Sequence, residues 1–173
     1  DQVLSLDPGM REALVNRAVL HLRAGRPEAA LGDAREATTR HTEDAVAWVA
    51  LAQALAATGD RKGAIQADTT AIEKGPRLME AWANRGAHRA AEGDHVAAIA
   101  DFDQAIALHP STSVLWRNRA GSHRAQGDLA GALEQYRVSL AIHEKLAAQD
   151  PGNATWQGDL SVNHDKGGDV LRE

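Results

Sequence analysis

Apolar residues recur at intervals of three and four along most of the chain, and the whole pattern repeats every 34 residues. This spacing predicts amphipathic helices, and a fixed period of this length indicates a repeat protein. One column of the repeat holds large side chains and a second holds aliphatic ones: Leu14, Trp48, Trp82 and Trp116, then Leu31, Ile65, Ile99 and Leu133. Two further columns hold small residues, one on each helix of a pair, so that two helices can approach closely: Ala18, Ala52, Gly86 and Ala120, then Ala30, Ala64, Ala98 and Ala132.

Glycine, aspartate and proline mark the ends of the predicted helices. A glycine column falls where each first helix must end, because glycine adopts the left-handed conformation that closes a helix: Gly25, Gly59, Gly93 and Gly127. The next residue is Asp60, Asp94 or Asp128 in three copies, placed to cap the second helix, and the first copy has Pro27 at its first helical position instead. Pro8, Pro76 and Pro110 end second helices.

These signals predict helices at residues 11–24, 27–40, 46–58, 61–74, 80–92, 95–108, 113–126, 129–149 and 154–172. The corresponding units are 11–44, 45–78, 79–112 and 113–150, between partial units at 1–10 and 151–173. The last complete unit has a longer second helix, because its stop moves by seven residues, from Glu144 to Pro151. We expect the chain to be part of a longer array, with exposed apolar ends that favour self-association: Val3, Leu4 and Leu6, then Trp156, Leu160 and Leu171.

The pattern resembles the tetratricopeptide repeat, and Trp82, Gly86, Ala98, Phe102 and Pro110 match its signature. The resemblance implies an all-α, right-handed solenoid of antiparallel helix pairs, whose first helices line a concave groove that receives a peptide or a helix. The lengthened C-terminal hairpin resembles units of large bacterial proteins that stand beside signalling or effector domains.

Some positions depart from the signature. Thr42 replaces the proline of the first unit, and Ala34 and Asp68 stand where the later units have Phe102 and Tyr136. We therefore expect the first two hairpins to be less tightly packed than the later two.

Arginine occupies the apolar stripe of three first helices. Arg17, Arg85 and Arg119 are each followed sixteen residues later by a polar residue, namely Asp33, Asp101 and Gln135, whereas the second copy pairs Leu51 with Ala67. This covariation predicts an ion pair between the two helices of a hairpin, since a guanidinium suits such a bond. The alternative is a solvated surface pair worth less than ~1 kcal/mol. A second polar column is expected at a partly exposed edge: His21, Arg89 and His123, with Leu55 in the second copy.

Composition and motifs exclude most other functions. A net charge of −5 and a pI near 5.9 argue against a nucleic-acid partner, and no apolar stretch is long enough for a membrane span. The chain has no cysteine, and arginine exceeds lysine, which indicates a cytoplasmic, bacterial protein. His88, His95, Glu92 and Asp94 cluster near one turn but lack a metal-ligand spacing, and no hydrolase or phosphate-loop motif occurs. We expect no enzyme activity, no catalytic residue, no cofactor and no metal.

The remaining candidate is the concave groove that the resemblance implies. Asn16, Asn84 and Asn118 share a column that faces this groove, and an asparagine amide can bond both polar groups of a peptide backbone. The alternative is that asparagine is simply a common polar residue at an exposed position. Further groove residues are expected to be Val19, Val49, Gln53, Ala87, Arg117 and Arg124.

The groove would be apolar towards its N-terminal side and basic towards its C-terminal side. Its columns hold no lysine, so a clamp for a terminal carboxylate has little support. The sequence therefore predicts a scaffold for protein–protein interaction. The alternatives are a passive spacer or self-assembly segment of a larger bacterial signalling or effector protein, and an enzyme or metal protein.

Overall fold

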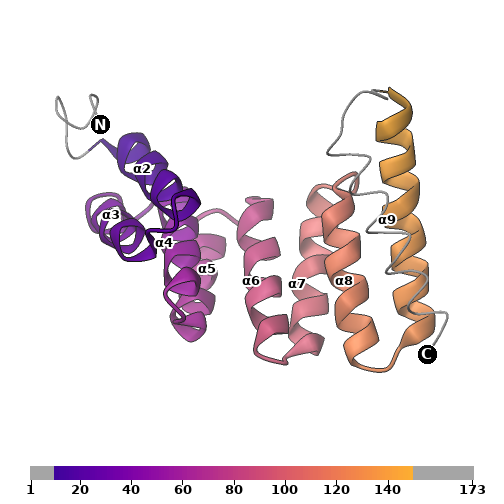
Figure 1. Cartoon of the computed structure of the whole chain (residues 1–173). Coiled ribbons are helices and arrows are strands. Elements are labelled where there is room, and N and C mark those ends of the chain that lie inside the picture. Colours follow the sequence, from indigo (N-terminus) through magenta and orange to yellow (C-terminus); the bar gives the residue numbers. More distant parts are fainter. Residues whose placement is uncertain (1–9, 150–173) are drawn as a thin grey trace. The chain divides into compact units, whose positions relative to one another are not determined.

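The computed structural model describes residues 10–149, which form eight α-helices and no strand (Figure 1). The helices are α2 (Arg11–Arg23), α3 (Pro27–Arg40), α4 (Ala45–Ala57), α5 (Arg61–Lys74), α6 (Met79–Ala91), α7 (His95–Leu108), α8 (Ser113–Ala125) and α9 (Leu129–Gln149). All eight agree with the predicted helices to within one residue at each end, and α9 continues past Glu144 as predicted. The predicted helix at 154–172 and the six apolar end residues lie outside the described residues.

The glycine and aspartate columns act as the sequence predicts. Each of the four glycines has a positive φ, between 67° and 92°, which an L side chain rarely adopts: Gly25, Gly59, Gly93 and Gly127. The carboxylate of Asp60 accepts a hydrogen bond of 2.9 Å from the backbone N–H of Gly63, and Asp94 and Asp128 cap their helices in the same way. Each first helix thus ends, and the next begins, within four residues.

The chain separates into two compact units, Asp1–His88 and Arg89–Glu173, which are described separately. In the first unit, α2 packs against α3, α3 against α4, and α4 against α5. Its largest core cluster consists mainly of alanine, with Leu51 and Ala67 among its buried members. In the second unit, α7 packs against α8 and α8 against α9, around Ala120, Ala132 and Tyr136. Small residues therefore bring the helices together in both units.

The tryptophan column has a second role that its hydrophobicity does not reveal. The indole N–H of Trp48 donates a hydrogen bond of 2.8 Å to the carbonyl of Thr42, six residues earlier. Trp82 and Trp116 donate in the same way to the carbonyls of Pro76 and Pro110. Each tryptophan therefore holds the loop that precedes its own helix.

The column represented by Phe102 is buried in all four copies, as Ala34, Asp68, Phe102 and Tyr136. Twenty residues after its first three members stand Ala54, His88 and Ser122, which belong to the next first helix. The carboxylate of Asp68 is fully buried and lies 2.9 Å from Nδ1 of His88. The second copy thus replaces an apolar contact with a buried acid–histidine pair.

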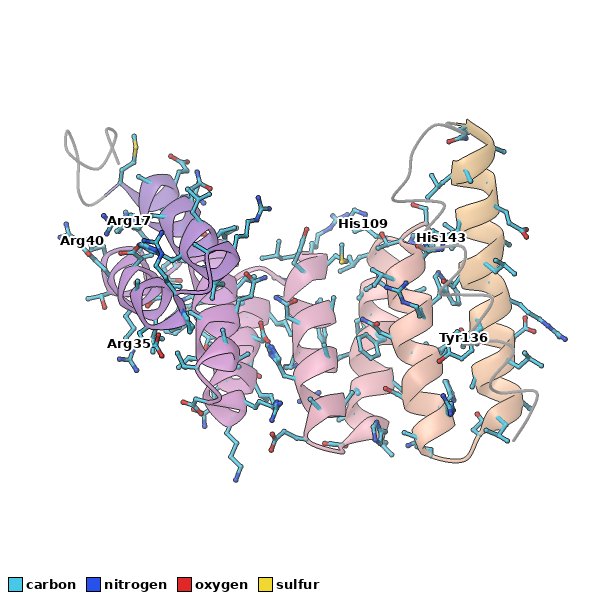
Figure 2. All side chains as sticks on the ribbon, viewed as in Figure 1. Arg17, Arg35, Arg40, His109, Tyr136 and His143 are labelled. Carbon is cyan, nitrogen blue, oxygen red and sulfur yellow. The ribbon has the colours of Figure 1, made fainter. Side chains whose placement is uncertain are left out.

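A chain of buried hydrogen bonds joins the lengthened α9 to the start of α8. Oγ of Ser139 donates to the carbonyl of Ser113, and Oγ of Ser113 lies 3.0 Å from Nε2 of His143. Nδ1 of His143 lies 3.2 Å from the carbonyl of Ser139, which can only accept, so Nδ1 donates this bond; in the neutral imidazole Nε2 then accepts from Ser113. Figure 2 shows the His143 and Tyr136 side chains extending from α9 on the side of α8.

Replacing Ser122 with alanine is expected to raise the free energy of unfolding by about 1 kcal/mol. The Ser122 side chain is 1% exposed, and its hydroxyl has no hydrogen-bond partner in the described part of the chain. Chemical denaturation measures the change. Ser139→Ala is the matched control, because this equally buried hydroxyl has a partner and its loss should destabilise. A destabilised Ser122→Ala variant would contradict the prediction.

Candidate partner-binding site

The predicted contacts between the two helices of a hairpin are present in the first and fourth repeats, where both partners lie within one compact unit. Nε of Arg17 donates to Oδ2 of Asp33 at 2.7 Å and its Nη2 to Oδ1 at 2.5 Å, a bidentate contact. This bond raises the pKa of Arg17 above its usual value. Nη1 of Arg119 donates to Oε1 of Gln135 at 2.8 Å, as predicted. Arg85 and Asp101 fall in different units, so that pair stays a prediction.

The Arg17–Asp33 pair is partly buried rather than solvated, because only 10% of the aspartate side chain is exposed. In the second copy, the equivalent Leu51 and Ala67 both belong to the buried apolar cluster. The interpretation of this column as an inter-helix contact is therefore confirmed for the first, second and fourth copies.

The second polar column also contacts the second helices, although the sequence predicts only a partly exposed edge for it. Nη1 of Arg89 donates to the buried carboxylate of Asp101 at 2.8 Å, and Nε2 of His21 lies 3.6 Å from Asp33. Leu55 packs against the apolar cluster of the second copy. The signal was present, because this column turns apolar in the same copy as Leu51 and Ala67.

His123 departs from this arrangement and bonds the capping residue of α9 instead. Its Nδ1 lies 2.8 Å from Oδ2 of Asp128. The pKa of Asp128 is lowered, first by the hydrogen bond from the Gly131 backbone and second by the bond from His123. In the fourth copy, the inter-helix contact is therefore made by Arg119, which also bonds Asp103 at 2.7 Å.

The residues predicted for the groove differ in how much surface they offer. Asn16 and Ala87 are exposed, and six are partly exposed: Val19, Gln53, Asn84, Arg117, Asn118 and Arg124. Val49 is only 8% exposed because it packs in a cluster with Ile72 and Ala81, so it offers a partner little surface. In the first unit, the packing of α2 against α4 brings the helices of Asn16 and Gln53 side by side.

Asn84 stands apart from the other two asparagines. Its Nδ2 is buried and has no hydrogen-bond partner among the described residues. Buried amide donors are nearly always paired in native proteins, so an acceptor from a bound molecule would satisfy Nδ2 once the Asn84 side chain turns outward.

The described residues show little that suggests catalysis or metal binding. They contain no group of three or more histidine or acidic side chains placed to hold a metal ion. Ser113 and His143 are of the residue types that serve as a nucleophile and its base, but they are only 8% and 3% exposed. A substrate cannot reach this pair, which joins α8 to α9. Between residues 10 and 149, no helix has the length and apolar character needed to cross a membrane.

The chain belongs to the tetratricopeptide repeat family. The family's repeat matches four overlapping stretches, at residues 1–45, 15–78, 49–113 and 85–154. The sequence thus identified the family correctly, and proteins of this family typically serve as scaffolds for protein–protein interaction.

Solved structures with the same solenoid fold support the assignment. A crystal structure of MamA is 22% identical, with a TM-score of 0.76, over 85% of this chain and 86% of that one. TTC0263, a thermophilic tetratricopeptide protein of Thermus thermophilus, is 23% identical with a TM-score of 0.76, covering 94% and 85%. PilF of Pseudomonas aeruginosa is 20% identical with a TM-score of 0.73, covering 90% and 68%. No curated protein sequence matches significantly.

Proposed function

We propose that this chain binds a peptide or a partner helix along the exposed side of its first helices, here called the first-helix face. This face comprises Asn16 and Val19 on α2, Gln53 on α4, Asn84 and Ala87 on α6, and Arg117, Asn118 and Arg124 on α8. The membership of the family supports a protein partner. The unpaired Nδ2 of Asn84 is the observation that carries the assignment to this face.

The chemistry of this face suits recognition of a peptide backbone. An asparagine amide donates from Nδ2 and accepts at Oδ1, so it can bond the C=O and N–H of an extended segment whatever its side chains. Most other members of the face on α2, α4 and α6 are small or apolar, so they can pack against a partner without selecting its charge. The proposal therefore predicts binding that tolerates variation in the partner's sequence.

Replacing Asn84 and Asn118 with alanine is expected to weaken binding without unfolding the chain. Each lost hydrogen bond should cost about 0.5–1.5 kcal/mol, which is a few-fold to tenfold in affinity. The ligands are peptides of twelve residues selected from a displayed random library on the unaltered protein, and titration calorimetry gives the affinities.

The matched control is Gln66→Ala with Gln104→Ala, which removes two exposed amides from the second helices α5 and α7. This variant should bind the selected peptides as the unaltered protein does. If the asparagine variant binds normally and the glutamine variant does not, the partner lies on the second helices and the proposal is wrong.

A further inference from the structure

The second helix of one repeat meets the first helix of the next through a pair of residues that stand twenty positions apart. The described residues contain three such pairs: Ala34 and Ala54, Asp68 and His88, then Phe102 and Ser122. The first pair belongs to one buried apolar cluster, and both members of the third are 1% exposed. In the second pair, Nδ1 of the histidine lies 2.9 Å from the buried carboxylate. Equivalent positions of one fold therefore hold two small residues, an acid and a histidine, and a large and a small residue.

Stability alone does not explain the acid–histidine pair. Asp68 is fully buried, and the loss of water around a buried carboxylate offsets most of what a partner contributes. The equivalent Ala34 and Phe102 are as deeply buried and require no polar partner. Since apolar residues fit this position in the neighbouring repeats, the polar pair must provide something other than a more stable interface.

The pair excludes other helices from this interface. At the position of His88, the other described first helices present Leu20, Ala54 and Ser122. Any of these three opposite Asp68 would leave the carboxylate buried without the histidine, which is the costly state of a buried charge. In the opposite exchange, His88 would be buried without an acid against the alanine of α3, or would overfill the space beside the phenylalanine of α7.

A second column separates the other two interfaces from each other. Its pairs stand ten positions apart, again on a second helix and the next first helix: Ala37 and Ala47, Ala71 and Ala81, then Ala105 and Leu115. All six residues are buried, with exposed fractions of 0% or 1%. A leucine would overfill the space of Ala47, and an alanine would leave a cavity in place of Leu115. Each interface between consecutive repeats therefore accepts its own first helix best.

We propose that the Asp68–His88 pair fixes the order in which the repeats dock, because it makes the interface between the second and third repeats reject the other first helices. Repeat proteins misassemble when equivalent surfaces of two molecules dock in the wrong register. A single buried polar contact fixes the register of helices in coiled coils at a cost in stability. The pair accordingly serves specificity, and the neighbouring apolar interfaces supply stability.

Two double variants test the proposal, because each makes this interface equivalent to a neighbouring one. Asp68→Phe with His88→Ser reproduces the pair of the next interface, and Asp68→Ala with His88→Ala reproduces the alanine pair of the preceding one. Each chain would be unfolded in denaturant and refolded at a low and a high protein concentration. Size-exclusion chromatography with light scattering then gives the fraction in dimers and larger species. We expect this fraction at high concentration to be about tenfold larger in both variants than in the unaltered chain.

Two controls separate specificity from stability. Asp68→His with His88→Asp keeps an acid–histidine pair with the positions exchanged, so it should refold as the unaltered chain does. Asp33→Ala breaks the contact with Arg17 inside one hairpin and leaves the pairs between repeats unchanged, so it lowers stability without altering the order of docking.

Three results would overturn the inference. In the first, the two double variants refold with the same associated fraction as the unaltered chain. In the second, Asp33→Ala raises this fraction as much as they do, so that association follows from lost stability. In the third, the exchanged pair raises it equally, so that the chemistry of the pair does not set the register. If the exchanged variant does not fold, the comparison of the two double variants with Asp33→Ala decides.

Discussion

Replacing His88 with alanine is expected to lower the free energy of unfolding by roughly 3 kcal/mol, measured by chemical denaturation at neutral pH. The carboxylate of Asp68 is fully buried, and His88 lies 2.9 Å from it. Removing the histidine deprives a buried carboxylate of this partner, which costs more than the pair itself contributes.

A double variant built from the chain's own sequence tests this explanation. In the next copy, the positions of Asp68 and His88 hold Phe102 and Ser122, both of them buried. Asp68→Phe combined with His88→Ser should therefore recover most of the stability that His88→Ala loses. If the double variant is less stable than His88→Ala, the two positions do not form an exchangeable pair.

Replacing Asp33 with alanine is expected to cost about 2 kcal/mol, because two charged hydrogen bonds from Arg17 are lost. A third of the Arg17 side chain is exposed, so water can replace part of the hydrogen bonding that Arg17 loses. The same denaturation measurement gives the change.

The second copy supplies the compensating variant. Arg17→Leu, His21→Leu and Asp33→Ala together reproduce Leu51, Leu55 and Ala67, which pack in an apolar cluster. The triple variant should be at least as stable as the unaltered chain, since an apolar group often replaces a buried ion pair without loss. A triple variant that is as unstable as Asp33→Ala would show that these positions do not act together.

Comparison of the copies explains why so much of the fold was predictable. Glycine and aspartate columns fix the helix ends through local backbone chemistry, and the predicted bounds of all eight described helices are confirmed to within one residue. The Arg17–Asp33 contact was predictable because Leu51 and Ala67 change together in the second copy. Positions that change together from copy to copy therefore indicate which residues are in contact.

Two contacts that the sequence analysis does not predict show no such covariation between the two helices of one hairpin. Asp68 and His88 pair across two consecutive repeats, and the sequence places His88 only near a turn. Among the four described hairpins, the Ser113–His143 contact is confined to the one with the longer helix, so no other described copy repeats it. The expectation that Val49 lines the groove rests on the resemblance alone, and its burial by Ile72 and Ala81 depends on side-chain sizes in the neighbouring helices.

The most direct test of the account is to map a bound peptide on the chain by nuclear magnetic resonance. The isotope-labelled protein would be titrated with one of the peptides selected from the random library, and the shifted backbone amides would be assigned. We expect these amides to lie in α2, α4, α6 and α8, with Asn84 and Asn118 among the most affected residues. Shifts confined to the second helices α3, α5, α7 and α9 would contradict it.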